Sequence, residues 1–248
     1  SYPVRQIERI SKARISEIAK LKQKKYRKDI SMFVVEGQRL IDQLHIYGIN
    51  AVELYTTNPM FDRIDDIPTS LCSEDELKRI CDSGHPSGIA GLYPLPRPGV
   101  ESFHRALYLD RVSDPGNLGT IFRTAAAFGM DAIFLSPASC ELANPKVVRA
   151  SLGAVYAVAW QVLDIDALCA INARKLVLDM NADTALEEYL PSAGPEIFIL
   201  GSEAHGVDRA LMAMADERLK IRMQGSMESL NLAISTSILC YQLSLYRA

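Results

Sequence analysis

The sequence has few side chains that could form disulfides or bind a metal. Its 248 residues include five cysteines and four histidines, and the cysteines are scattered, with no Cys-x-x-Cys pair. An odd number of isolated cysteines argues against a disulfide framework, and the cysteines and histidines are not spaced like zinc ligands. We therefore expect no metal site, and we interpret the cysteines as small buried apolar residues.

Long apolar segments are also absent. No uninterrupted apolar run approaches the ~18 residues that cross a membrane, and no charged and then apolar leader opens the sequence. We therefore expect no membrane contact and a cytoplasmic location. Hydrophobic residues make up 48% of the chain and charged residues 23%, which is ordinary for a globular protein with a substantial core.

The glycine patterns of common nucleotide-binding loops are missing. No Gly-x-Gly-x-x-Gly follows a predicted strand, which excludes a dinucleotide fingerprint. Gly201 and Gly206 have the spacing of a phosphate-binding loop, but Val207 and Asp208 stand where Lys and Ser or Thr are needed. A nucleotide-hydrolysing site is therefore excluded. His205 has no partner at a supporting spacing, so we do not assign it as a base.

The chain does have an uneven distribution of charge. Residues 1–28 carry ten Lys and Arg against two acids, a net charge of +8, whereas the other 220 residues carry −11. A basic arm on an acidic body indicates a polyanionic partner, although the amphipathic residues 10–21 equally suit a solvated helix face. Within residues 22–28 a tyrosine lies among the cations, which favours nucleic acid.

Alternating strand and helix patterns predict an α/β protein with two domains. Residues 94–102 contain three prolines and a glycine and form the predicted linker, so the domains span residues 1–97 and 104–248. In the first domain we predict strands at 32–37, 51–57 and 88–95, and helices at 5–23, 38–48 and 73–81. The last of these helices has a capping box of Ser73 and Glu76.

In the second domain several predicted strands are apolar throughout, as in a parallel sheet covered on both faces. The predicted strands are 106–112, 131–136, 154–162, 175–180, 196–201 and 218–223, and the predicted helices are 118–129, 145–153, 165–173, 207–215 and 228–247. The last helix has few charges and is apolar on most sides. We expect it to be buried on most sides, as in a helix that packs on a partner subunit.

Three segments place polar residues just beyond predicted strands, where open α/β sheets bind ligands. Taken singly, each segment also fits a purely structural role, namely a tight turn with a surface arginine or a simple helix cap. Asn117, for example, is a plausible cap of the helix that carries Arg123. The polar residues are Asn117 and Arg123 in the first segment, Glu203 in the second, and Ser229 and Asn231 in the third.

The order of these segments is more specific than any one of them. The sequences LDRVSDPGNLGTIFRTAAAFGMDAIFL (109–135), ILGSEAHGVDRALMAMADERLKIRM (199–223) and SLNLAISTSIL (229–239) resemble the three motifs of the SpoU, or TrmH-type, RNA ribose 2′-O-methyltransferases of the SPOUT superfamily. Residues 144–158 between them are also typical of that family. Residues 24–40 resemble its substrate-binding domain, which is similar to a small ribosomal protein. The resemblance covers nearly the whole chain.

The resemblance implies a fold, a cofactor and partners. The fold is a C-terminal α/β domain with a parallel sheet and a deep trefoil knot, a rare exception to the rule against threading, plus the small N-terminal α/β domain. The cofactor is S-adenosyl-L-methionine, bound largely by backbone groups, and the enzyme is a homodimer. The implied substrate is a ribose 2′-hydroxyl of structured RNA, ribosomal RNA ahead of transfer RNA. The alternative is a non-catalytic RNA-binding protein of the same fold.

The family's site residues can be carried onto this sequence by motif. Arg123 matches the catalytic arginine, and we expect it to grip an RNA phosphate bidentately, while Asn117 orients Arg123 or the ribose. The implied catalytic residues are Asn117, Arg123, Glu203, Ser229 and Asn231, and the implied cofactor-binding residues are Gly201, Ile221, Met223, Ser229 and Leu230. We expect RNA contacts from Lys24, Lys25, Arg27, Arg39 and Arg149.

One position departs from the family pattern. The third block usually reads Ile-Pro-Met, and here it is Ile221-Arg222-Met223. Because the cofactor contacts there use backbone groups, we expect the protein to remain functional. We expect the arginine at position 222 to affect cofactor affinity more than any other property.

Overall fold

The computed structural model describes residues 6–202 and 204–246. The chain divides into two compact units, Ser1–Pro96 and Arg97–Ala248. The division falls inside the proline-rich residues 94–102. Glu203 lies outside the described residues.

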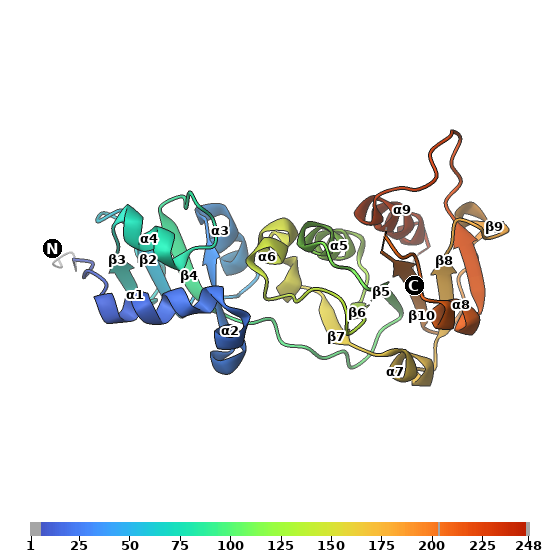
Figure 1. Ribbon diagram of the computed structural model, residues 1–248, viewed down its shortest axis with the longest axis horizontal. Coiled ribbons are helices and arrows are strands. Elements are labelled where there is room, and N and C mark those ends of the chain that lie inside the picture. The colour runs from blue at the N-terminus through green and yellow to red at the C-terminus, as the bar shows by residue number, and fades with distance from the viewer. Residues whose placement is uncertain (1–5, 203, 247–248) are drawn as a thin grey trace. The chain divides into compact units, whose positions relative to one another are not determined.

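The first unit is built on a four-stranded sheet with the order β1-β4-β2-β3. β4 is antiparallel to both β1 and β2, and β3 is parallel to β2. The unit is therefore a small α/β domain with a mixed sheet (Figure 1). Its elements are α1 (Lys12–Ala19), η1 (Lys20–Lys22), α2 (Lys24–Ile30), β1 (Met32–Glu36), α3 (Gln38–Ile46), β2 (Glu53–Thr56), β3 (Thr69–Leu71), α4 (Glu74–Ile80) and β4 (Ile89–Pro94).

The N-terminal helix is shorter than predicted and is followed by a second one. α1 begins only at Lys12, because the Ser11 side chain caps it by accepting from the Arg14 backbone N–H. At Gln23 the backbone is extended, with φ −96° and ψ 131°, and this residue separates η1 from α2. The basic residues 20–28 therefore lie on two short helical segments and not on one continuous face.

Arg27 explains part of this break and corrects one prediction. Its side chain is buried, at 6% exposure, and its Nη1 donates to the carbonyls of Leu21 and Lys22 at 3.0 and 2.9 Å. Those carbonyls lie where the helix ends and lack ordinary helical partners. Arg27 therefore closes a helix end inside the protein, and the prediction that it contacts RNA is wrong.

The second unit contains a seven-stranded sheet with the order β7-β6-β5-β10-β8-β11-β9. Each strand pair in it is parallel, as the continuous apolar runs predict. Its elements are β5 (Arg105–Asp110), α5 (Pro115–Phe128), β6 (Ala132–Leu135), α6 (Pro145–Ser151), η2 (Ala154–Tyr156), β7 (Ala159–Val162), α7 (Ile165–Ala170), β8 (Arg174–Leu178), β9 (Thr184–Ala185), η3 (Leu186–Glu188), β10 (Glu196–Gly201), α8 (Arg209–Met214), β11 (Glu217–Lys220) and α9 (Leu232–Ser244).

Helices cover both faces of this sheet. α5, α6 and α9 lie on one face, and α7 and α8 lie on the other (Figure 1). The central strands β5 and β10 are buried almost throughout, so that side chains from both of their faces enter the core. Gly119 on α5 allows the closest approach to α6, because a Cβ there would lie 2.5 Å from Ala150 Cβ and from the Val147 carbonyl oxygen.

Two sequence predictions in this unit need correction. Residues 154–162 form not one strand but η2 and the short β7, because Gly153 adopts a left-handed conformation, with φ +84°, and starts a 3-10 turn. The last helix begins at Leu232 and not at residue 228. Within one chain, Ile234, Ile238 and Tyr241 along this helix and Leu245 at its end are exposed, and the expectation that the helix packs on a partner subunit stays a prediction.

The register of the sheet brings two of the sequence motifs together. β5 and β10 are adjacent and parallel, with Asp110 opposite Gly201 at their carboxyl ends. The turn that leads into α5 and the turn that leads into α8 therefore leave the sheet side by side. This edge of the sheet is where ligands bind in open α/β folds.

Candidate active site

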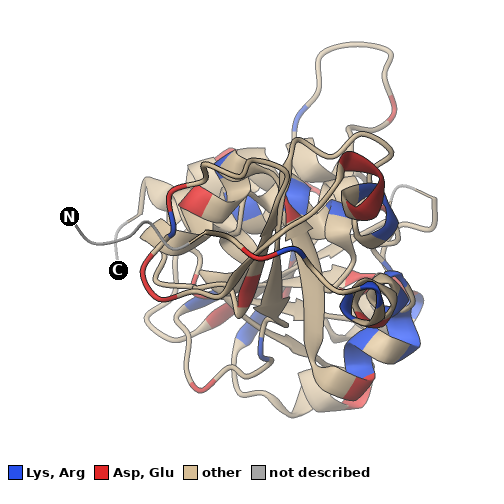
Figure 2. Ribbon diagram, turned by 90° about the vertical axis from the view of Figure 1, so that its left-hand side faces the viewer, with Lys and Arg blue, Asp and Glu red and all other residues tan. Residues whose placement is uncertain are grey.

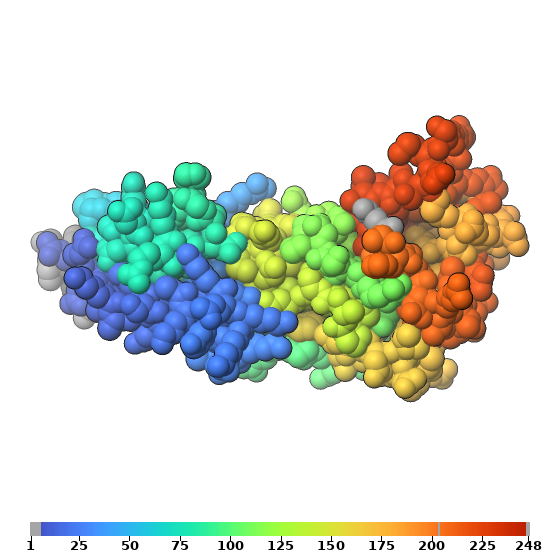
Figure 3. Space-filling model, in the orientation of Figure 1, coloured from blue at the N-terminus to red at the C-terminus, as the bar shows by residue number. Residues whose placement is uncertain are grey.

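A cavity of roughly 370 Å³ opens at the carboxyl ends of β8 and β10. Most of its lining comes from three stretches of chain: residues 178–181 at the end of β8, residues 200–202 and 205–207 around the end of β10, and a set of residues from 219 to 235 that runs from β11 into α9. Met212 of α8 completes the lining. Residues 221–231 between β11 and α9 project from the body of the unit (Figures 1 and 3). The volume of the cavity is within the usual range for small-molecule sites.

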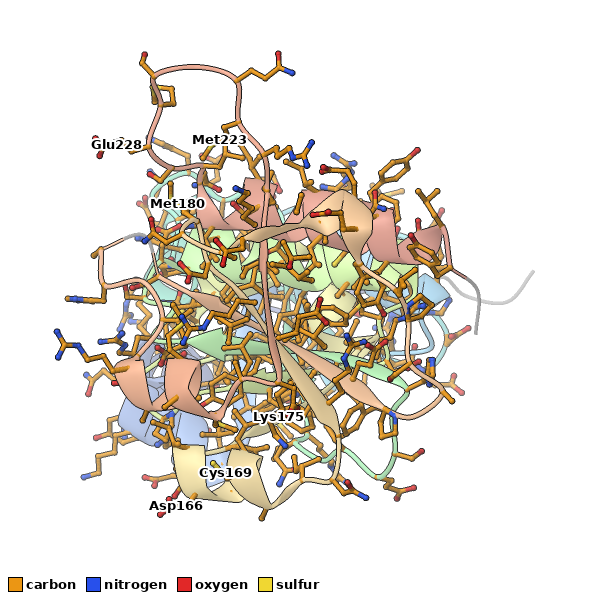
Figure 4. All side chains as sticks on the ribbon, turned by 90° about the vertical axis from the view of Figure 1, so that its right-hand side faces the viewer. Asp166, Cys169, Lys175, Met180, Met223 and Glu228 are labelled. Atoms are coloured by element: carbon orange, nitrogen blue, oxygen red, sulfur yellow. The ribbon has the colours of Figure 1, made fainter. Side chains whose placement is uncertain are left out.

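The five residues predicted to bind the cofactor all line this cavity. Gly201 ends β10, Ile221 and Met223 follow β11, and Ser229 and Leu230 precede α9. Met223 and Glu228 lie on the projecting loop, with Met180 below it (Figure 4). The structure thus gathers in one cavity residues that the sequence separates by up to 29 positions.

Gly201 is required by a close backbone approach. A Cβ built on it would lie 2.1 Å from the carbonyl carbon and oxygen of Gly206 and 2.4 Å from the Val207 nitrogen. The turn after β10 folds back over Gly201 because the Gly206 N–H donates to the Ser202 carbonyl at 2.8 Å. Backbone groups of this turn therefore form one wall of the cavity.

Asn117 is not the cap of α5, which corrects a sequence prediction. The cap is Asp114, whose carboxylate accepts from the Asn117 N–H at 2.8 Å, and Pro115 takes the first helical position. Proline prefers that position, so the Asp-Pro pair was the signal that could have identified the cap. The Asn117 side chain is consequently available for another contact.

That contact joins the first motif to the third. Asn231 Nδ2 donates to Asn117 Oδ1 at 3.2 Å, although 114 residues separate the two. Asn231 Oδ1 caps α9 by accepting from the N–H groups of Ala233 and Ile234 at 2.9 and 3.3 Å. Both ends of the Asn231 amide are thus used, and the beginnings of α5 and α9 are held together at the site.

Arg123 is exposed on α5. Among the described residues no hydrogen bond or ion pair is recorded for it, and it does not line the cavity of its own chain. Arg123 lies six positions after Asn117, which places the two side chains about 120° apart around the helix. Among the described residues no hydrogen bond joins Asn117 to Arg123 within one chain, and both roles predicted for Asn117, orienting Arg123 or the ribose, stay predictions.

The other predicted RNA contacts fall in different environments. Lys24, Lys25 and Arg39 are exposed, and Arg149 on α6 is half-buried. Seen from one end of the molecule, Lys and Arg gather along α1 and α2 (Figure 2). This basic surface remains without Arg27.

Two residues beside the site were not predicted from the sequence. Asp110 at the end of β5 is buried, and its Oδ2 accepts from the Asp208 N–H at 2.9 Å. Arg111, the next residue, has a left-handed backbone with φ +57°, and its Nη2 donates to the Gly206 carbonyl at 3.3 Å. A charged Asp-Arg pair directly after a buried strand was the available signal.

Cys140, Cys240 and Tyr108 carry no charge at neutral pH. Burial raises the pKa of the Cys240 thiol to about 12 and that of Cys140 to about 11. Burial, helped by Asp110, raises the pKa of Tyr108 to about 12, and its hydroxyl donates to the Leu163 carbonyl. These groups are not nucleophiles or bases at neutral pH.

The described residues hold neither a metal-binding cluster nor a membrane-spanning helix. No group of three or more His, Cys, Asp or Glu side chains there could hold a metal ion. In that same part of the chain, no helix has the length and apolarity to cross a membrane. A second, open hollow of roughly 420 Å³ lies between α7 and the start of β8, on the side of the unit that carries Asp166, Cys169 and Lys175 (Figure 4).

Comparison with known protein families covers both units. Residues 104–241 match the family model described as the SpoU rRNA Methylase family. Residues 12–91 match the model described as an MRM3-like substrate binding domain. These matches confirm the family resemblance predicted from the three motifs.

Similar proteins span nearly the whole chain. A Bacillus subtilis protein named 23S rRNA (guanosine(2553)-2′-O)-methyltransferase RlmP is 30% identical over 97% of this chain and 99% of its own. The solved structure of a putative RNA methyltransferase of the TrmH family from Porphyromonas gingivalis is 31% identical, with a TM-score of 0.82 over 94% of this chain and 97% of that one. The AdoMet complex of the SpoU methyltransferase AviRb from Streptomyces viridochromogenes, 20% identical over 94% of this chain and 98% of that one, shares the fold with a TM-score of 0.80.

Proposed function

Because this chain belongs to the SpoU rRNA methylase family, we propose that it transfers a methyl group from S-adenosyl-L-methionine to a ribose 2′-hydroxyl of structured RNA. Ribosomal RNA is the first candidate, since the Bacillus subtilis relative is named for 23S rRNA, and transfer RNA is the second. The observation that carries the proposal is the single cavity lined by all five motif residues expected to bind the cofactor.

The cavity suits the cofactor in shape and chemistry. S-adenosyl-L-methionine supplies an activated methyl group on a sulfonium. The turn closed over Gly201 presents backbone groups, and Leu178, Met180 and Leu230 add apolar surface. Such a mixture of apolar walls and few polar groups is typical of cofactor sites. Ile221 and Met223 line the cavity even though Arg222, where the family usually has proline, points to Glu187 at 3.7 Å.

Arg123 has the chemistry to position the RNA. A guanidinium stays protonated and cannot serve as a base at ordinary pH. It can grip a phosphate with two parallel hydrogen bonds and so lower the pKa of the neighbouring 2′-hydroxyl. Its exposure leaves it accessible to such a phosphate. Alignment of the hydroxyl with the methyl group is then the main contribution of the protein.

The polar residues of the third motif complete the site. The Asn117–Asn231 hydrogen bond fixes the two asparagines where α5 and α9 begin. We assign them to the ribose, and we assign Ser229, which lines the cavity, to the border between cofactor and target nucleotide. Glu203 belongs to this set by motif alone, because it lies outside the described residues.

We further propose that the enzyme is a homodimer formed through α9. Ile234, Ile238, Tyr241 and Leu245 recur at helical spacing, are exposed, and present an apolar stripe along α9. Phe128 at the end of α5 is also partly exposed and packs edge-to-face on Tyr241 at 6.0 Å. This surface would bring Arg123 of one subunit towards the cofactor of the other, which agrees with its position outside the cavity of its own chain.

The remaining finer proposals concern topology and the first unit. We propose that the C-terminal segment threads to form the trefoil knot; the support is that the turn after β10 and the segment between β11 and α9 line one cavity. For the first unit we propose RNA binding through the basic surface of α1 and α2, with Lys24 and Lys25 as contacts, and a similarity to a small ribosomal protein. Arg39 and Arg149 are proposed as further contacts.

The experiment that tests this function measures transfer of labelled methyl groups from S-adenosyl-L-methionine to unmodified ribosomal and transfer RNA. Wild type is compared with Arg123→Ala, Arg123→Lys and Arg209→Ala, the last being a control at another exposed arginine of the same unit. We expect one RNA to be labelled and one ribose to become resistant to alkali. Both Arg123 variants should lose most of the activity, because lysine cannot make the bidentate contact, and the control should keep it.

Two outcomes would contradict parts of this proposal. Near-full activity of Arg123→Lys would contradict the bidentate role of Arg123. RNA binding and cofactor binding without any labelled RNA would favour the non-catalytic RNA-binding protein.

A further inference from the structure

The end of β5 holds the turn that follows β10 at two points. Asp110 Oδ2 accepts from the Asp208 N–H at 2.9 Å, beyond the turn. Arg111 Nη2 donates to the Gly206 carbonyl at 3.3 Å, within it. The two side chains also pair with each other, with Arg111 Nε 3.3 Å from Asp110 Oδ2. The two adjacent residues at the end of β5 thus hold the neighbouring chain segment at Gly206 and Asp208, where the turn ends.

Arg111 makes these contacts from a strained backbone conformation. Its φ of +57° is unusual for a residue with a side chain, and its N–H donates to Ser136 Oγ at 2.7 Å. Asn, Asp or Gly would adopt this conformation more easily. A residue kept in such a conformation is one whose side chain has a task there, and the task visible for Arg111 is the bond to Gly206.

The gripped turn is a wall of the cofactor cavity. Gly201, Ser202, Gly206 and Val207 all line the cavity, and the turn lies so close to Gly201 that no side chain fits between them. Arg111 and Asp110 do not line the cavity themselves. Any effect they have on the cofactor therefore acts through the position of the turn.

We propose that Arg111, oriented by Asp110, is a positioning residue that holds Gly206, which closes the turn onto Ser202, in the position that receives S-adenosyl-L-methionine. This rests on the cofactor site proposed above. The buried carboxylate fixes the guanidinium, and the guanidinium fixes the Gly206 carbonyl. Since residue 111 also begins the segment that leads to Asn117 and Arg123, the same pair ties the cofactor wall to the RNA-facing helix α5.

The test measures binding of S-adenosyl-L-homocysteine by calorimetry in the absence of RNA, with the full chain. Arg111→Gly suits the left-handed backbone but removes the guanidinium. Arg111→Lys keeps the charge but not the fork that reaches Asp110 and Gly206 together. Asp65→Gly is the matched control, because Asp65 also has a positive φ, of +46°, and is exposed in the first unit. Urea unfolding establishes that each variant is folded.

We expect Arg111→Gly and Arg111→Lys to weaken binding about tenfold, the ratio that corresponds to one lost hydrogen bond to a charged group, and to raise the KM for the cofactor but not for RNA. Asp65→Gly should bind like wild type. Binding by both Arg111 variants within twofold of wild type would overturn the inference alone. A raised KM for RNA with normal cofactor binding would also overturn it, in favour of direct RNA contact. Failure of wild type to bind would overturn the proposed cofactor site and this inference with it.

Discussion

The substitution Gly201→Ala tests the cavity wall most directly. The added methyl would lie 2.1 Å from the Gly206 carbonyl carbon and oxygen, whereas ordinary carbon contacts need about 3.5 Å or more. The neighbouring atoms are backbone and cannot rotate away, so the turn 202–206 must retreat by more than one ångström. Overpacking of this kind costs about 1–3 kcal/mol in the free energy of unfolding.

The larger effect should be on the cofactor. The displaced turn is a cavity wall, and loss of even one well-placed backbone hydrogen bond, about 1.4 kcal/mol, corresponds to a tenfold increase in Kd. We therefore expect calorimetry with S-adenosyl-L-homocysteine to give a Kd at least ten times that of wild type. The unfolding cost would be measured by urea titration.

Gly225→Ala is the control for this experiment. Gly225 lies in the projecting segment between β11 and α9, and a Cβ there would meet nothing within 4 Å. Its substitution should leave both the Kd and the stability nearly unchanged. A Gly201→Ala protein that binds the cofactor product within twofold of wild type would show that the turn does not form the cofactor wall.

Three further predictions concern the asparagine bridge, the basic helices and the cysteines. Asn231→Asp should keep the α9 cap and the urea midpoint but lose the amide that donates to Asn117, so that methyl transfer falls while stability is unchanged. Asn231→Ala should lose methyl transfer and, because the cap is removed, also about 1 kcal/mol of stability. Arg27→Ala should lower the free energy of unfolding by about 1–3 kcal/mol. Lys25→Ala should leave the urea midpoint unchanged and weaken RNA binding in a filter assay. A stable Arg27→Ala protein with weakened RNA binding, or a destabilised Lys25→Ala protein with normal RNA binding, would contradict the assignment of the two residues. A thiol reagent at pH 8 should modify the exposed Cys169 quickly and the buried Cys240, with its raised pKa, only on unfolding. Rapid modification of Cys240 in the folded protein would contradict this burial.

The sheet of the second unit was predictable because its strands are buried on both faces and therefore read as apolar runs. β5, β6, β8 and β10 all lie within their predicted ranges or a residue from them. The short strands β3 and β9 were missed because residues 69–71 and 184–185 are too few to show a period. Edge strands of this length depend on their neighbours more than on their own sequence.

The site was predictable in its composition and not in its contacts. Motif resemblance indicated which residues belong together, but the sequence could not reveal that Asn231 donates to Asn117 or that Arg27 turns inward. Both depend on where distant segments end in space. Arg27 in particular looks like its exposed neighbours in the sequence, and only its hydrogen bonds to the carbonyls at the break between η1 and α2 distinguish it.

The strand order has a consequence for biosynthesis. β10 inserts between β5 and β8, and β11 between β8 and β9, so the middle of the sheet is filled by chain that leaves the ribosome late. The cavity needs residues as far apart as Leu178 and Ser235, and the asparagine bridge joins positions 117 and 231. Domains that lie earlier in a chain generally fold first during synthesis. A nascent chain can therefore present its finished RNA-binding unit well before it has anywhere to hold a methyl donor, and methylation must wait for the emergence of α9.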